Sequence, residues 1–145
     1  MTDRGPERPR LEGRVLLVDD EQPVREAYSR VLRRLGCTVE TAVSAVAALE
    51  LVRATSFDLI VTDIGMAGMD GTQFLRVIRE RDLDVPVILM TGNPRFDTAV
   101  KAVDAGAFRY LTKPIDLGVL EQAVRAALHK HAADGHGWRD LQPRY

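Results

Sequence analysis

Short apolar runs recur along this chain, and each of them ends abruptly in polar residues. Three runs have this form: residues 15–18, 59–61 and 87–90. A continuous apolar run of this length is typical of a strand that is buried on both faces of a sheet. Residues 38–42 instead alternate between polar and apolar, as expected of a half-exposed edge strand, and residues 108–111 form a short fifth candidate. These five segments predict the strands of one sheet.

Between the predicted strands, apolar side chains recur at the spacing of an amphipathic helix. The first such segment ends at Gly36, where a helix C-cap is expected, and Ser44 is placed to cap the next helix. For the last three helices the spacing also predicts which side chains face the core. In the third helix these are Phe74, Leu75 and Ile78, and in the fourth they are Phe96, Ala99, Val100 and Val103. In the fifth helix they are Leu120, Ala123, Val124, Ala127 and Leu128. Strands that alternate with helices in this way predict an α/β fold, a doubly wound parallel sheet of five strands.

Polar side chains of related chemistry follow four of the five predicted strands. Asp19 and Asp20 follow the first strand, Asp63 the third, Thr91 the fourth and Lys113 the fifth. Taken singly, each is more typical of a turn or of the surface, but ligands bind beyond the carboxyl ends of parallel strands, where these groups would converge. Three mutually repelling carboxylates with no histidine or second cysteine nearby favour a hard cation, Mg²⁺ or Mn²⁺ in its place. Such a site is typical of phosphoryl transfer.

Length and charge narrow the possible functions. The 145 residues predict one domain, and the 20 basic and 21 acidic residues leave a net charge of −1, which provides no overall field for nucleic acid or anionic lipid. No apolar run approaches a membrane span, no secretory leader is visible, and the single cysteine cannot form an internal disulfide. We therefore expect a soluble cytoplasmic protein with a flexible arm over residues 1–12, a domain over 13–131 and a tail or linker start over 132–145.

Four segments carry a resemblance to a known family: VLLVDDE (15–21), DLIVTDIGMAGMDG (58–71), VPVILMTGN (85–93) and AFRYLTKP (107–114). In these segments the chain resembles the receiver domain of two-component response regulators, the chemotaxis-regulator-like superfamily. The resemblance covers about residues 13–130, and its signature residues fall at the ends of the predicted strands. It implies a flavodoxin-like (βα)5 fold with the strand order 2-1-3-4-5.

The resemblance implies that Asp63 is a phosphoacceptor. Its carboxylate would take a phosphoryl group from the phosphohistidine of a sensor histidine kinase or of a phosphotransfer protein, to give an acyl phosphate. Asp20, Asp63 and the backbone carbonyl of Gly65 would bind Mg²⁺ directly, while Asp19 would bind it through a water. The chain would be no ordinary enzyme, although it would catalyse its own phosphorylation and dephosphorylation.

The remaining signature residues would hold the phosphoryl group and respond to it. Lys113 would pair with one phosphoryl oxygen, and its peptide bond to Pro114 is expected to be cis. Thr91 would donate its hydroxyl to another oxygen, and Tyr110 would swing inward when Thr91 moves. Two variable positions would tune the lifetime of the acyl phosphate in opposite directions: Gly65 and Asn93.

The expected output is a phosphorylation-dependent population shift that changes protein contacts. The face of the fourth predicted helix, the fifth strand and the fifth helix would contact a downstream protein or a second copy of the chain. This face includes Phe96, Lys101, Arg109 and Tyr110.

Three other interpretations stay open. The chain would be the N-terminal receiver of a longer regulator with an effector domain if the open reading frame continued. It would be a receiver-like binding module if it failed to take up phosphate. A Mg²⁺-dependent phosphatase is disfavoured, because such enzymes carry D-x-D-x-T at the first strand, where this chain has Asp19-Asp20-Glu21.

Two features near the C-terminus carry weaker expectations. His129, His131 and His136 suggest a metal site, but residues two apart on a helix do not face one another, so a solvated helix end is expected. Trp138 is expected to pack on the domain or on a partner.

Overall fold

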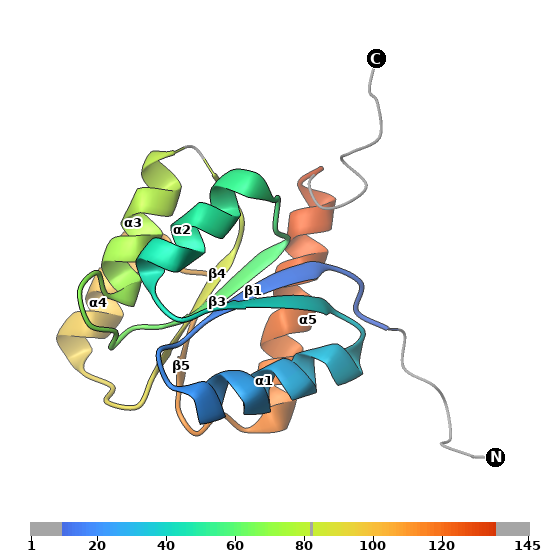
Figure 1. The fold of residues 1–145 in the computed structure, drawn as a ribbon, viewed down its shortest axis with the longest axis horizontal. Coiled ribbons are helices and arrows are strands. Elements are labelled where there is room, and N and C mark those ends of the chain that lie inside the picture. The colour runs from blue at the N-terminus through green and yellow to red at the C-terminus, as the bar shows by residue number, and fades with distance from the viewer. Residues whose placement is uncertain (1–9, 82, 136–145) are drawn as a thin grey trace.

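The fold is a five-stranded parallel sheet between two layers of helices, as seen in a computed structural model that describes residues 10–81 and 83–135 (Figure 1). Its elements alternate along the chain: β1 (Arg14–Val18), α1 (Gln22–Leu35), β2 (Thr38–Ala42), α2 (Ala45–Ala54), β3 (Leu59–Asp63), α3 (Gly71–Glu80), β4 (Val87–Thr91), α4 (Phe96–Asp104), β5 (Arg109–Thr112) and α5 (Leu117–Ala133). The strand order is β2-β1-β3-β4-β5 and every neighbouring pair is parallel. The expected fold class and strand order are confirmed.

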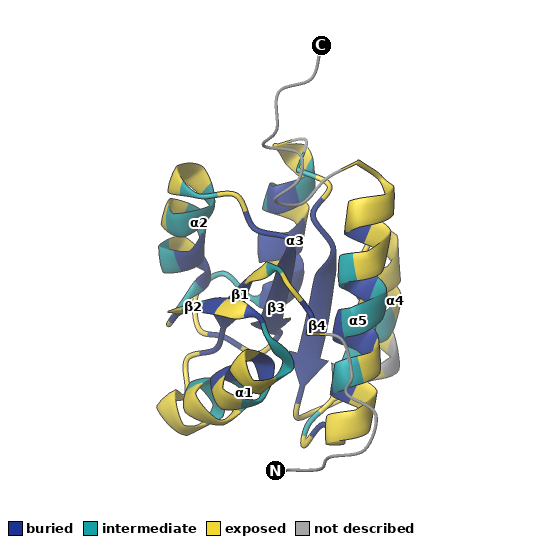
Figure 2. Cartoon of the chain, turned by 90° about the vertical axis from the view of Figure 1, so that its right-hand side faces the viewer, coloured by how far each residue is buried: buried dark blue, intermediate teal, exposed yellow. Residues whose placement is uncertain are grey.

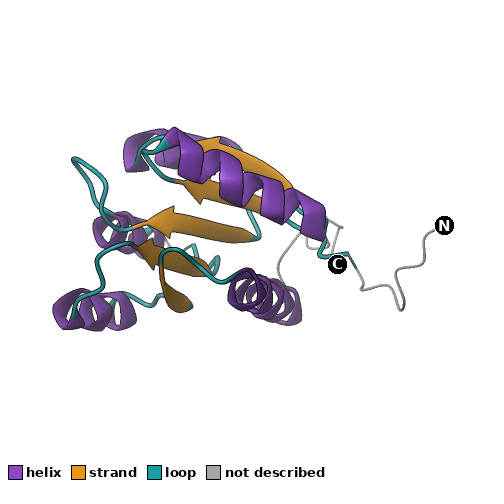
Figure 3. Ribbon diagram, turned by 90° about the horizontal axis from the view of Figure 1, so that it is seen from below, coloured by secondary structure: helices purple, strands orange, loops and turns teal. Residues whose placement is uncertain are grey.

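Each face of the sheet is covered by its own layer of helices (Figure 3). Successive residues of a strand point to opposite faces, so Leu16 packs in one core cluster and Val15 in the other. The first cluster includes side chains of α2, α3 and α4, and the second includes side chains of α1 and α5. β3 and β4 are buried along their whole length, as the dark blue strands of Figure 2 show. Both faces of the central strands are therefore filled, as their continuous apolar sequence predicts.

The predicted helix ends are confirmed at two positions. Gly36 has a φ of 116° and its N–H donates to the carbonyls of Arg33 and Leu32, which closes α1. This left-handed conformation favours glycine, which has no Cβ to clash. Ser44 accepts a hydrogen bond from the backbone N–H of Ala47 at 3.1 Å and so caps α2.

The predicted core-facing stripe of α4 is wrong at two of its four residues, Val100 and Val103. Val103 is 74% exposed and Val100 is 41% exposed, whereas Ala102, which was not part of the predicted stripe, is buried. The side chain of Phe96 lies outside what the structure describes. α4 packs beside α3, and Ala102 is the residue of its described side chains that is buried in the first core cluster. Apolar spacing therefore marked a face that the fold leaves exposed.

The two ends of the predicted domain also differ from expectation. Leu11, expected in a flexible arm, is buried in the second core cluster, and its N–H donates to the carbonyl of Leu35 at 2.8 Å. At the other end α5 continues to Ala133, and His131 is buried with its Nε2 3.5 Å from Asp58 Oδ1, so the expectation of a solvated side chain is wrong there. His129 is exposed as expected. His136 and Trp138 lie outside the described residues.

No helix among residues 10–81 and 83–135 has both the length and the apolar character that crossing a membrane requires.

Candidate functional site

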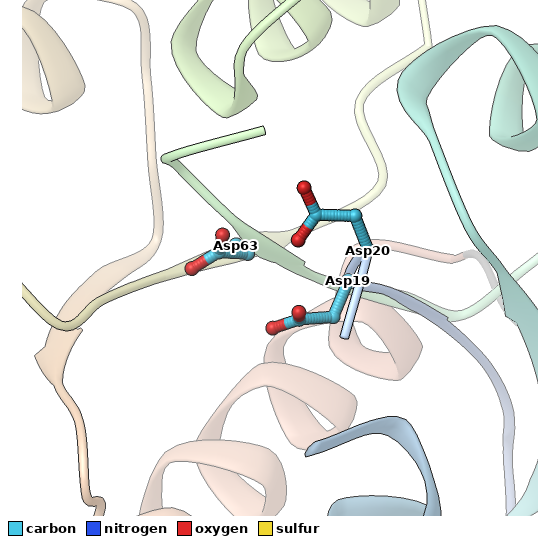
Figure 4. Close-up of side chains that lie close together, drawn as sticks. All are labelled: Asp19, Asp20 and Asp63. Atoms are coloured by element: carbon cyan, nitrogen blue, oxygen red, sulfur yellow. The ribbon is translucent and has the colours of Figure 1, made fainter. Parts of the chain in front are cut away.

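Three carboxylates meet at the carboxyl ends of β1 and β3 (Figure 4). One oxygen each of Asp19, Asp20 and Asp63 lies within 4.8 Å of the other two. The register explains this proximity, because Val18 lies opposite Thr62 and the residues that follow share one edge of the sheet. Asp19 is fully buried and Asp63 is 7% exposed, while Asp20 is exposed. The cluster therefore has two buried members and one that faces solvent.

Lys113 brings a positive charge to the two buried carboxylates. Its Nζ lies 2.9 Å from Asp19 Oδ2 and 2.9 Å from Asp63 Oδ1, and the side chain is 14% exposed. The Lys113 N–H donates to the carbonyl of Thr91 at 2.7 Å, which fixes the residue just beyond the end of β5. The Lys113–Pro114 peptide bond is cis. One ammonium thus bridges two carboxylates from different strands.

The pKa values of Asp63 and Lys113 are both raised, as a result of opposing effects of burial and of neighbouring charges. Burial raises the pKa of Asp63, and the negative charges of Asp19 and Asp20 add to it, against the lowering effect of Lys113. Burial lowers the pKa of Lys113, but its hydrogen bonds and charge interactions with Asp63 and Asp19 outweigh burial and raise it overall. The lysine therefore stays charged, while the ionised form of Asp63 is held under electrostatic strain.

The donor set fits a small divalent cation. The side-chain groups of the cluster are carboxylates, which are the hard oxygen ligands that Mg²⁺ prefers, and the described part of the chain offers no histidine or thiol to the cluster. Three carboxylates against one ammonium leave an excess of negative charge that a divalent cation would offset.

The loop after β3 approaches Asp63 closely. A Cβ on Gly71 would clash with the backbone oxygen of Asp63, so only glycine allows this packing. Gly71 N–H also donates to the carbonyl of Ile64 at 2.9 Å. A Cβ on Gly65 would instead lie 3.8 Å from Asp63 Oδ2, at ordinary contact distance. The space beside the Asp63 carboxylate is therefore open because residue 65 has no side chain.

Thr91 and Tyr110 lie on neighbouring strands but hold different partners. Thr91 is buried at the end of β4, and its Oγ1 accepts a hydrogen bond from the N–H of Asn93 at 3.0 Å. Tyr110, on β5, is half-buried and its hydroxyl lies 2.8 Å from Thr98 Oγ1 on α4. Asn93 itself is exposed.

Three residues that support the site were missed at the level of sequence. Arg25 donates to the backbone carbonyl of Asp19 at 2.7 Å, and Tyr28 accepts from the N–H of Ile115 at 3.1 Å, just beyond the Lys113–Pro114 bond. Thr98, which holds the Tyr110 hydroxyl, is the third. Tyr28 was visible as a polar-tipped aromatic on an apolar stripe, but Arg25 and Thr98 carry no signal that separates them from ordinary surface residues.

Comparison with known proteins identifies the family of the chain. The model of the response regulator receiver domain matches residues 15–125. Response regulator protein PilR of Pseudomonas aeruginosa is 37% identical over 115 residues, which is 79% of this chain and 26% of PilR. The DNA-binding transcriptional regulator NtrC of Escherichia coli is 36% identical over 132 residues, 91% of this chain and 27% of NtrC. The chain thus spans about a quarter of the length of these curated relatives.

The fold has solved counterparts as well. The signal receiver domain of an HD domain-containing protein from Pseudomonas fluorescens aligns with a TM-score of 0.78 and 33% identity. The alignment covers 86% of this chain and 99% of that one.

Proposed function

The chain belongs to the response regulator receiver domains, and from this premise we propose that it accepts a phosphoryl group on Asp63 and switches its protein contacts in response. One observation carries the proposal above all: Asp63 is a buried carboxylate that shares the Lys113 ammonium with Asp19 at the carboxyl edge of the sheet. Phosphoryl transfer needs positioning and charge neutralisation, and this arrangement provides both.

In the proposed reaction an oxygen of Asp63 forms a bond to phosphorus. The bond between phosphorus and the histidine nitrogen of the donor breaks, and its electron pair stays on the imidazole. A histidine kinase or a phosphotransfer protein would supply that phosphohistidine. Hydrolysis of the acyl phosphate by water would return the Asp63 carboxylate and release inorganic phosphate.

The surrounding residues have distinct proposed roles. Asp20, Asp63 and the Gly65 carbonyl would hold Mg²⁺, with Asp19 acting through a water, and the cation would neutralise charge on the phosphoryl oxygens. Lys113 already lies 2.9 Å from Asp63 Oδ1, so a phosphoryl oxygen on that carboxylate would be within its reach. The chain thereby takes part in its own phosphorylation without being an ordinary enzyme.

The proposed switch joins Thr91 to Tyr110. The Thr91 hydroxyl would donate to a phosphoryl oxygen, and Tyr110 would move inward and exchange its 2.8 Å contact with Thr98 for a buried position. Phosphorylation would then shift the population between two conformers, one with Tyr110 held by Thr98 and one with Tyr110 drawn inward.

The face of α4, β5 and α5 is the proposed contact surface. Lys101 and Arg109 are exposed on it, and so are the α4 residues Val100 and Val103. An exposed apolar pair beside positive charges suits a protein partner, either a downstream protein or a second copy of this chain.

We propose that residues 65 and 93 set the lifetime of the acyl phosphate. Gly65 leaves the Asp63 carboxylate uncovered, whereas the exposed Asn93, two residues after Thr91, can orient water. We also propose a cytoplasmic location for this domain, on the strength of its family membership.

A second candidate keeps the same chemistry in a longer protein. The curated relatives are about four times as long as the matched segment, and NtrC is described as a DNA-binding transcriptional regulator. In that case the α4, β5 and α5 face would contact an output domain of the same polypeptide. The coding sequence after Tyr145 decides between the two candidates.

The test is incubation with acetyl phosphate and Mg²⁺, followed by intact-mass measurement. We expect one added phosphoryl group on the parent protein and on Asp104→Asn, a control at an exposed aspartate, but none on Asp63→Asn or after addition of EDTA. No adduct on the parent, together with no detectable beryllofluoride complex, would overturn the proposal and favour a binding module that works without phosphorylation.

A further inference from the structure

A cleft of about 650 Å³ lies between α1 and β2, and none of the three clustered carboxylates lines it. α1 and β2 lie side by side in Figure 1, at the edge of the sheet. The cleft is lined by Gln22, Arg25, Glu26, Ser29, Arg30, Arg33, Arg34 and Thr41. We infer that it binds a small polyanion carrying two or more phosphate groups.

The lining of the cleft is rich in positive charge. Four arginines face one acid, Glu26, in a chain whose net charge is −1. Glu26 already accepts a hydrogen bond from Gln22 at 2.8 Å. In the described part of the chain, Arg30 and Arg34 have neither an ion pair nor a hydrogen bond through their side chains. The acid of the cleft therefore does not neutralise these two guanidinium groups.

Two other arginines of the cleft are held in place. Arg25 donates to the carbonyl of Asp19 at 2.7 Å, and Arg33 donates to the carbonyl of Val39 at 3.2 Å. These bonds use single donors of a guanidinium group that carries five, so further donors remain for a ligand. The cleft thus combines two fixed guanidinium groups with two that can close on an anion.

Helix stability does not account for this arrangement. Arg30 is three residues from Arg33 and four from Arg34, so like charges are neighbours on the helix surface and repel one another. The helix dipole favours Arg33 and Arg34 in the last turn, but the effect falls off within that turn and does not reach Arg25 or Arg30. An anion bound between these groups would remove the repulsion.

Ser29 supplies a second, independent sign of a missing ligand. It is the buried member of the lining, and its hydroxyl has no hydrogen-bond partner among the described residues. A buried polar atom without a partner is destabilising. The hydroxyl is covered in this structure, so it would donate to an anionic oxygen in the cleft after rotation of the Ser29 side chain.

The composition of the lining selects the class of ligand. It contains no aromatic side chain on which a base could stack and no aliphatic side chain for a lipid tail. Guanidinium groups match the planar geometry of phosphate oxygens and bind them in pairs. The volume falls within the ~300–1,000 Å³ range of small-molecule sites. A compact phosphate compound with several charged groups fits these limits.

The experiment is calorimetric titration of the unphosphorylated protein with inorganic tripolyphosphate, at fixed ionic strength and in EDTA. We expect saturable one-to-one binding. The double variant Arg30→Gln, Arg34→Gln should weaken it at least about tenfold, since two charge-assisted contacts are lost, and Ser29→Ala should weaken it about two- to fivefold. Arg53→Gln, an exposed arginine on α2, serves as the matched control and should leave the affinity unchanged.

Several results would overturn the inference. Tripolyphosphate binding that does not saturate would show a non-specific electrostatic attraction in place of a site. An affinity that falls as much in Arg53→Gln as in the double arginine variant would show the same. Tighter binding of a tetraglutamate peptide than of tripolyphosphate would assign it to an acidic protein segment instead. Circular dichroism of each variant separates lost binding from lost folding. Asp63→Asn should bind as the parent does, so the outcome is independent of the proposed phosphorylation.

Discussion

Strand β3 has a buried aspartate at each of its two ends, and the surroundings of the two carboxylates are opposite. Asp58 directly precedes the strand and is 8% exposed, and Asp63 ends it and is 7% exposed. Asp58 accepts the backbone N–H of Arg14 at 2.8 Å and lies 3.5 Å from the His131 imidazole. Asp63 lies instead beside two further carboxylates and the single ammonium of Lys113.

The difference teaches that burial alone does not mark a functional carboxylate. Asp58 has a hydrogen-bond donor from the backbone of β1 and a histidine from α5, so it joins the end of one helix to the sheet. Asp63 has neighbours of its own charge, which raise its pKa together with burial. In a buried carboxylate among like charges the ionised form is disfavoured, and a bound cation would stabilise it. A buried carboxylate whose hydrogen-bond and charge partners are present instead stabilises the fold.

The largest effect is expected from Lys113→Ala. This change leaves Asp19 and Asp63 buried without their shared ammonium, and breaking such a pair costs about 3 kcal/mol. The free energy of unfolding, measured by urea denaturation in EDTA, should fall by that amount. Added Mg²⁺ should then stabilise the variant more than the parent, because no ammonium competes for the carboxylates.

Lys130→Ala is the control for this experiment. Lys130 is 59% exposed on its side chain and pairs with Asp134 at 3.0 Å along α5. An exposed pair of this kind contributes about 0.5 kcal/mol or less. Equal losses in the two lysine variants would show that Lys113 acts as an ordinary surface residue.

Asp58→Ala should have the next largest effect, a loss of about 2 kcal/mol. It leaves the Arg14 N–H without its acceptor and His131 without its neighbouring carboxylate. Unlike the loss in Lys113→Ala, this loss relative to the parent should be the same with and without Mg²⁺, because the carboxylate cluster is unchanged. A loss that becomes smaller in Mg²⁺ would contradict the contrast between the two ends of β3.

Cys37 provides a pH-dependent measure of the amino-terminal end of the sheet. Burial, and then the charge of Asp58, raise the pKa of its thiol from 9.0 to about 11. The unfolded thiol therefore ionises first, so this contribution to stability is complete below pH 9 and is lost as the pH rises toward 11. At pH 10 the parent should have lost about 1 kcal/mol more than Cys37→Ala, relative to pH 8. If the free energy of unfolding changed equally with pH in the parent and in Cys37→Ala, the raised pKa of Cys37 would be contradicted.

The sheet was predictable from the sequence because its signals are local. The apolar runs, the Gly36 and Ser44 caps and the polar residues at the strand ends each follow from a few neighbouring residues. Parallel topology then brings the strand ends to one edge without further information, which is why Asp19 and Asp63 could be placed together.

The wrong predictions concern burial that depends on segments distant in the sequence. Val103 belongs to an apolar stripe but is 74% exposed among the residues that the structure describes. His131 has the sequence position of a helix-end residue, but it is buried beside Asp58, just before β3. Leu11 is buried in the second core cluster, and its N–H donates to the carbonyl of Leu35 at the end of α1. Apolar periodicity shows which face of a helix is apolar, but it does not show which other element packs against that face. The burial of these three residues could therefore be determined only from the tertiary structure.

The smallest expected effects come from changing aspartate to asparagine at both ends of β3. Because the chemical change is the same, these two variants compare the surroundings of Asp63 and Asp58 most directly. Asp63→Asn removes a repelling charge of the carboxylate cluster and should raise the free energy of unfolding by about 0.5–1 kcal/mol at pH 7 in EDTA. Asp58→Asn should instead lower it by about 1 kcal/mol, since a charged acceptor becomes a neutral one. Opposite signs would mean that β3 supports the fold at one end and a ligand site at the other. A loss in both variants would mean that Asp63, like Asp58, is fully compensated by its neighbours, and that the cluster has no electrostatic demand for a cation.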